Sequence, residues 1–157
     1  MFSDQSISNI FQPVHNKSVL LPVFSNLISA GFPSPAEDFV DGVLDLNDLI
    51  SSPSSTFIVT VTGDSMTGAG IEDGDQLIVD RSLKPCPGNI VIALVHGDMT
   101  VKRLKRYKGQ WWLKPENSDY PTRPLPPGGE IWGVVAHTIK DHRHDGSGSV
   151  ILNRDVI

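Results

Sequence analysis

The sequence predicts a mainly β fold: a compact, mostly antiparallel β domain with a flexible N-terminal arm and a short helix. A hydrophobic period of two residues recurs between residues 56 and 140, as is typical of half-buried strands. The chain contains 12 prolines and 14 glycines, which favour many short elements over a few long helices. Its 157 residues correspond to about one domain. We therefore expect one β domain with short connections.

Residues 1–35 are expected to form an arm and not a domain. They are polar and irregular, and their apolar side chains follow no sustained period. We expect such a segment to pack on another surface, because it cannot enclose a core of its own. The scattered apolar residues include Phe2, Ile7, Ile10, Phe11, Val19, Leu20, Leu21, Val23 and Phe24.

A short helix is predicted directly after this arm. Ser34 is an N-cap candidate, Pro35 suits the first helical position, and Glu37 has the capping-box spacing. This helix should end near Gly42. A second helical turn is predicted over residues 45–50, with its first residue, an aspartate, as the cap.

The strands belong to a predicted domain over residues 36–140. In "TFIVTVTG", the side chains of Phe57, Val59 and Val61 fall on one face, and the residues between them fall on the other. The segment "MTVKRL" follows the turn "HGD" and forms a hairpin. Residues 141–157 are expected to form a flexible C-terminal tail. Further strands are expected at "QLIVD", "NIVIALV", "WWLKP" and "IWGVVAHTIK", with "PTRPLPPGGE" as a connection.

Charge and cysteine content argue against several classes of protein. A general nucleic-acid binder needs a positive surface, whereas the net charge here is -5, so no direct sequence-specific DNA binding is expected. The single cysteine, Cys86, precludes an intrachain disulfide and fits a reducing, cytoplasmic setting. No apolar run approaches the roughly 18 to 20 residues of a membrane span. The N-terminus also lacks the basic start and apolar core of a signal peptide. We expect a cytoplasmic protein without a membrane anchor.

Ser65 is the first candidate for chemistry. It is predicted to follow directly on a strand, among Gly63, Gly68 and Gly70. Glycines on both sides let the backbone turn sharply and let another chain approach, while amides of the turn could face a developing oxyanion. Gly-Asp-Ser is also a common turn sequence. Ser65 taken alone is therefore explained more simply as a turn former than as a nucleophile.

Lys102, in "TVKRL", is the second candidate. By strand alternation it shares a face with Thr100 and Leu104, whereas its two neighbours point the other way. If the Leu104 face is inward, burial disfavours the ammonium form and lowers the pKa of Lys102. A neutral lysine amine beside a serine hydroxyl can act as a general base. The alternative is that "KRLKRYK" is a solvated basic strand with all its lysines outward.

Together these motifs resemble the self-cleaving peptidase domain shared by LexA repressors and UmuD mutagenesis proteins. The matching segments are, in order, "GDSM", "GIEDGDQLIVD", "GNIVIAL" and "TVKRL". The upstream stretch "LPVFSNLISAGFPSPAEDF" is similar to the processing region of UmuD-like proteins, in which a Cys-Gly or Ala-Gly bond precedes Phe-Pro-Ser-Pro-Ala. The resemblance covers residues 20–140 and predicts the fold of the LexA/UmuD peptidase domain.

The resemblance implies a serine endopeptidase with a Ser-Lys dyad that cleaves its own chain and needs no cofactor or metal. It assigns Ser65 as the nucleophile, Lys102 as the general base, and Ala30-Gly31 as the scissile bond. It also implies a homodimer whose cleavage is stimulated by the RecA filament on single-stranded DNA. The processed form would be an accessory subunit of an error-prone, Y-family (UmuC-like) translesion DNA polymerase in the SOS response.

Other residues suggest chemistry less strongly. The histidines at positions 137, 142 and 144 lack a cysteine or carboxylate at ligand spacing, so no metal site is expected. Cys86 lies between two prolines and is expected in a loop. The three tryptophans are expected in the core or at a dimer interface and not as a base-stacking platform; they are Trp111, Trp112 and Trp132.

Three alternative functions follow from other features of the chain. A LexA-like self-cleaving regulator would need a helix-turn-helix domain, but the thirty residues that end at Ala30 are too few for one. A signal-peptidase relative, which also uses a Ser-Lys pair, would need a membrane anchor. A catalytically silent interaction scaffold would keep the β domain but would leave its own chain uncut.

Overall fold

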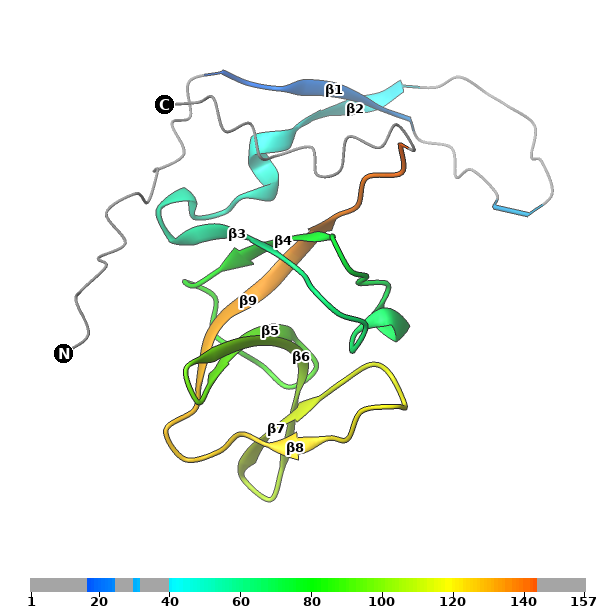
Figure 1. Cartoon of the computed structure of the whole chain (residues 1–157). Helices are drawn as coiled ribbons and strands as arrows, with labels where there is room; N and C mark the ends of the chain where they lie inside the picture. The colour runs from blue at the N-terminus through cyan, green and yellow to red at the C-terminus, as the bar shows by residue number, and fades with distance from the viewer. Residues whose placement is uncertain (1–16, 25–29, 32–39, 144–157) are drawn as a thin grey trace. The chain divides into compact units, whose positions relative to one another are not determined.

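Antiparallel β-strands form two sheets in the part of the chain that this computed structural model describes, residues 17–24, 30–31 and 40–143 (Figure 1). The chain divides into two units, residues 1–54 and residues 55–157. Each unit contains one of the sheets. The predicted mainly β, mostly antiparallel fold is therefore confirmed.

The first unit contains a two-stranded ribbon followed by a turn of helix. Strand β1 (Leu20–Phe24) pairs antiparallel with β2 (Val40–Asp45). The 3-10 helix η1 (Leu46–Leu49) follows at once, and Asp45 caps it by accepting hydrogen bonds from the backbone of Asn47 (3.0 Å) and Val19 (3.1 Å). These donors, led by the Asn47 amide, lower the pKa of Asp45. The helical turn predicted over residues 45–50 is thus confirmed in its 3-10 form.

Two expectations for the first unit are wrong. Residues 40–42, predicted as the end of a helix, lie in β2, whereas the preceding residues 32–39 of that prediction lie outside the described part. Strand β1 lies within the arm that was expected to be irregular. It pairs with residues 16 to 25 positions downstream, and local capping signals do not report such a long-range contact. Pro22 is compatible with this strand because a two-stranded ribbon has free edges.

The second unit contains a seven-stranded sheet with the order β3-β4-β9-β5-β6-β7-β8. The short 3-10 helices η2 (Pro53–Ser55) and η3 (Thr67–Ala69) flank its first strand. Every segment predicted as a strand in this region forms one, and β8 arises within the stretch predicted as a connection. The strands are β3 (Thr56–Thr60), β4 (Gln76–Asp80), β5 (Ile90–Val95), β6 (Asp98–Tyr107), β7 (Gln110–Lys114), β8 (Arg123–Pro124) and β9 (Glu130–Ile139).

Strand β5 is buried on both faces and separates two apolar clusters. Ile92 belongs to one cluster, whereas Val91 and Ala93 belong to the other. Trp132 packs against the first cluster and Trp111 against the second, as expected of core aromatics. The first cluster consists of Val61, Met66, Ile71, Leu77, Val79 and Ile92, and the second of Val91, Ala93, Leu104, Leu113 and Val134.

The first cluster shows that the sheet curls. It joins Val61, which follows the edge strand β3, to Ile92 of β5, and Val101 of β6 packs against it. Strands β3 and β6 are far apart in the strand order, so only a strongly curved sheet brings them to one core. This curvature places the turn after β3 beside the middle of β6.

Candidate active site

Ser65 lies in the turn that connects β3 and β4. Strand β3 ends at Thr60, so the expectation that Ser65 follows directly on a strand is wrong. Gly63 and Gly70 have φ values of +89° and +75°, which side chains with a Cβ rarely adopt, and they allow the turn to reverse on both sides of the serine. Next to the serine, Met66 is only 1% exposed and anchors the turn in the core. Ser65 is therefore held at the surface by a buried neighbour.

Lys102 lies on β6, and its ammonium nitrogen reaches Ser65. Lys102 Nζ donates hydrogen bonds to Ser65 Oγ (3.0 Å), Thr100 Oγ1 (2.7 Å) and the Val101 carbonyl (3.0 Å). Leu104, on the same face of the strand, is fully buried, so the predicted inward face is confirmed. The alternative of a solvated basic strand fits Lys105, which is exposed, but not Lys102.

Burial lowers the pKa of the Lys102 ammonium from its ordinary value of 10.5. Within the described ranges, no carboxylate forms an ion pair with this lysine to offset the cost of desolvation. The neighbours that accept its hydrogen bonds are two hydroxyls and a carbonyl, none of them charged. The environment therefore shifts the equilibrium of Lys102 toward the neutral amine, the form that can accept a proton from Ser65.

The pair opens into a cleft of about 340 Å³. Residues that follow β3 form one wall, and the middle of β6 forms another. Apolar side chains lie beside the dyad, so the cleft combines a hydroxyl and an amine with apolar contacts. Its lining includes Gly63, Ser65, Leu77, Ile92, Lys102 and Tyr120.

Two backbone amides of the turn, those of Ser65 and Met66, are the candidates for an oxyanion site. The amides of residues 67–71 all donate to backbone carbonyls. Among the hydrogen bonds of the described residues, none is donated by the amides of Ser65 and Met66. Paired amides at a nucleophile can stabilise a developing negative charge on oxygen.

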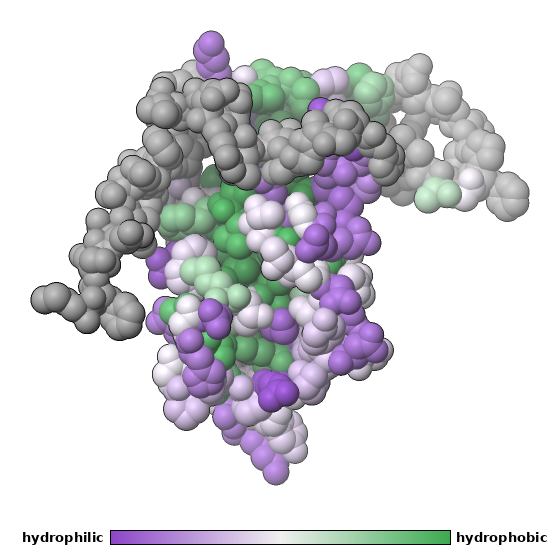
Figure 2. Space-filling model, viewed as in Figure 1, coloured by the Kyte–Doolittle hydropathy of each residue, from purple (hydrophilic) through white to green (hydrophobic). Residues whose placement is uncertain are grey.

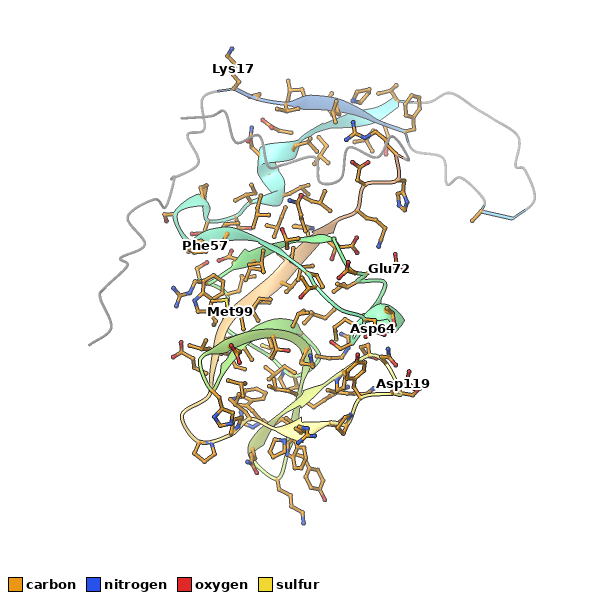
Figure 3. All side chains as sticks on the ribbon, in the orientation of Figure 1. Lys17, Phe57, Asp64, Glu72, Met99 and Asp119 are labelled. Atoms are coloured by element: carbon orange, nitrogen blue, oxygen red, sulfur yellow. The ribbon has the colours of Figure 1, made fainter. Side chains whose placement is uncertain are left out.

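Residues 116–120, for which no structure or role was predicted, pack against this turn. Asn117 Nδ2 donates to the Asp64 carbonyl (2.9 Å), and Tyr120 Oη donates to Asp64 Oδ1. Figure 3 shows Asp64 and Asp119 close together where the loop after β7 meets the turn. The signal available in the sequence was the polar and aromatic "ENSDY" directly after a strand.

Ala30 and Gly31, the predicted scissile pair, are both exposed. They lie between β1 and β2 in the chain, in the first unit, whereas Ser65 and Lys102 belong to the second. The structure thus brings the predicted nucleophile and base together. The approach of the Ala30-Gly31 bond to them stays a prediction.

The histidines and Cys86 were the remaining candidates for chemistry in the sequence. Over residues 17–24, 30–31 and 40–143, no group of three or more His, Cys, Asp or Glu side chains could hold a metal ion, and His144 lies outside these ranges. Cys86 is an exposed free thiol in the loop before β5, as predicted. No helix in the described part of the chain has the length and apolar character needed to cross a bilayer.

Comparison with known proteins finds one family and several similar chains. Residues 22–136 match the model of the family described as Peptidase S24-like. Protein MucA of Salmonella typhimurium is 42% identical over 126 residues, which cover 78% of this chain and 86% of MucA. Protein ImpA of Escherichia coli is 43% identical over 129 residues, covering 81% and 88%. The LexA repressor of Acidithiobacillus ferrooxidans is 45% identical over 95 residues, covering 59% of this chain and 46% of the repressor.

Proposed function

Because this chain is a UmuD-like member of the Peptidase S24-like family that includes LexA, we propose that it cleaves itself between Ala30 and Gly31 with Ser65 as nucleophile and Lys102 as general base. The family consists of self-cleaving serine peptidases. The observation that carries the residue assignment is the 3.0 Å separation of Lys102 Nζ and Ser65 Oγ beside the cleft. The lowered pKa of Lys102 supports it further.

The reaction follows the chemistry of these groups. Neutral Lys102 accepts the hydroxyl proton as Ser65 Oγ attacks the carbonyl carbon of Ala30, and the amides of Ser65 and Met66 stabilise the oxyanion. The C–N bond then breaks, and the amino group of Gly31 takes the proton from Lys102 as it leaves. Water hydrolyses the ester between Ala30 and Ser65, and the neutral amine of Lys102 again serves as base.

Delivery of the bond by the same polypeptide explains how so simple a site could work. A lone lysine base activates serine weakly, but a tethered bond is present at a high effective molarity, which can lower the barrier by several kcal/mol. Small residues at the junction suit a cleft of about 340 Å³. Any partner that favours the docked arm would then accelerate cleavage by shifting the population.

The rate of self-cleavage should rise with pH and then level off. Only the neutral form of Lys102 can accept the proton, so the rate should increase about tenfold per pH unit below its pKa. Burial lowers that pKa from 10.5, so the plateau should begin below this pH. Time courses of intact chain between pH 7 and pH 11 would measure the profile. A flat or falling profile would exclude lysine as the base.

We also propose the setting in which this peptidase acts. We place it in the cytoplasm, in the SOS response to DNA damage, with the RecA filament on single-stranded DNA as the stimulus and a Y-family polymerase subunit as the partner of the processed form. The similarity to MucA and ImpA over most of their lengths supports a UmuD-like role. A repressor role is less well supported, because the match to LexA covers 46% of that protein.

Cleavage would also change the surface of the first unit. A cut after Ala30 separates β1 from β2, and β1 is the strand that pairs with β2 within the described part. Strand β2 would then present free backbone groups beside Val43, an exposed apolar side chain. Figure 2 shows apolar surface on this ribbon, at the top of the view. We propose that this newly freed strand helps the processed form to bind its polymerase partner.

The processed form should therefore bind a Y-family polymerase subunit more tightly than the intact chain does, and both forms should be homodimers. Sedimentation velocity of the Ser65→Ala protein and of a chain starting at Gly31, each alone and with the polymerase subunit, would measure both properties. A monomer at micromolar concentration would contradict the dimer. Equal affinity of the two forms for the polymerase would contradict the switch.

A further inference from the structure

The loop after β7, residues 116–120, contacts the Ser65 turn at the surface of the second unit. Asn117 and Tyr120 both bind Asp64, the residue directly before the proposed nucleophile. One contact holds the backbone of Asp64 through its carbonyl, and the other holds its carboxylate. Two hydrogen bonds from one short loop therefore restrict the position of one residue beside Ser65.

A third contact brings the loop and the turn together at close range. The Gly68 amide donates to the Glu116 carbonyl at 2.7 Å. A Cβ on Gly68 would lie 2.5 Å from that carbonyl oxygen, so this approach requires glycine. The loop is thus fitted to the turn at both ends of the Ser65 segment, at Asp64 and at Gly68.

The loop is in turn tied to the strand that carries the proposed base. Arg103 follows Lys102 on β6 and points to the other face, where its Nε binds Glu116 Oε1 at 2.6 Å. This hydrogen bond lowers the pKa of Glu116 and keeps it ionised. Arg103 also donates to the Gly88 carbonyl at 2.7 Å. A continuous set of contacts therefore connects β6, the loop and the Ser65 turn.

We propose that residues 116–120 form a strap that fixes Ser65 against Lys102, with Tyr120 and Asn117 as its positioning residues. The inference rests on the proposed function, because it concerns the same serine. Ser65 and Lys102 come from two elements that are not neighbours in the sheet, so their 3.0 Å separation depends on what holds the turn to β6. Met66 anchors the turn from the core, and the strap holds it from the surface.

The strap gives Tyr120 a role in reactivity and not merely in packing. Tyr120 lines the cleft, and its hydroxyl donates to the Asp64 carboxylate, which raises the pKa of the phenol. Removal of this hydroxyl leaves the ring in place but frees the Asp64 side chain. Small displacements of a nucleophile reduce rates steeply, since a misplacement of about 1 Å can cost about a hundredfold, and a smaller shift of Ser65 should cost about tenfold.

The test compares Tyr120→Phe with Tyr107→Phe, its matched control. Tyr107 is the other tyrosine of the chain and lies exposed at the far end of β6. We expect Tyr120→Phe to lower both the rate of self-cleavage and the rate at which a fluorophosphonate labels Ser65 by about tenfold, with an unchanged melting temperature. Labelling does not require the arm to dock, so it reports the position of the serine. Tyr107→Phe should match the wild type in both rates.

Substitutions of Asp64, the residue that accepts the hydrogen bond from Tyr120, test the same contact from the other side. Asp64→Asn keeps an oxygen acceptor for Tyr120 and should retain most of the labelling rate, whereas Asp64→Ala should resemble Tyr120→Phe. The double change Tyr120→Phe with Asp64→Ala should add little to either single change, because both remove one interaction. Equal labelling of the Tyr120→Phe and Tyr107→Phe proteins would overturn the strap. Equal labelling of Ser65→Ala and wild type would instead overturn Ser65 as nucleophile.

Discussion

Replacing Lys102 by alanine should reduce the rate of self-cleavage by about a thousandfold or more. Lysine is the group within hydrogen-bond distance of Ser65 Oγ that can accept its proton, and loss of one member of such a catalytic unit removes most of its effect. Ser65→Ala should be equally inactive, and the double variant no worse, because the two groups act together. The measurement is the first-order loss of intact chain at pH 9.

Lys105→Ala is the matched control for this experiment. Lys105 lies three residues further along the same strand and is exposed, so its removal should leave cleavage unchanged. Circular dichroism would verify that the variants keep their β structure. Cleavage of Lys102→Ala at the rate of Lys105→Ala would show that the base lies elsewhere.

Replacing Ala30 by glutamate should block cleavage by about a hundredfold. In the proposed reaction the scissile residue enters a cleft of about 340 Å³ whose lining includes Leu77 and Lys102. A carboxylate there would lose its water, and it would favour the ammonium form of Lys102 over the neutral amine that the reaction needs. Lys17→Glu introduces the same side chain elsewhere in the first unit, at an exposed position, and should cleave normally. A normal rate for Ala30→Glu would place the scissile bond elsewhere.

The sequence predicted the β strands well where one face is buried. In β3 and its extension, Val59 and Val61 turn inward while Ile58 is half exposed, as the alternation predicts. The same alternation placed Lys102 on the face of buried Leu104. In both segments the period of two reflects a single buried face, and this is a local property that a short stretch can carry.

The ribbon could not be predicted in this way. Strand β1 has exposed apolar side chains on both faces, including Leu20 and Leu21, so it shows no alternation. The capping-box pattern at Ser34 and Glu37 predicted a helix that extends to Gly42, a residue that lies in β2 instead. Strand β2 forms by pairing with β1, which lies far away in the chain. The strap was missed for a related reason. Residues 116–120 form a loop, so they show no hydrophobic periodicity. Their contacts with Asp64 and Gly68 depend on the folded chain.

We propose that this chain cuts itself at one bond by means of its own serine. Intact mass measurement of the purified protein after incubation at pH 9 to 10, beside the Ser65→Ala protein, tests it most directly. We predict two fragments in the wild type, residues 1–30 and residues 31–157, and an unchanged mass in the variant. An uncut wild-type chain, or the same fragments from Ser65→Ala, would contradict the claim.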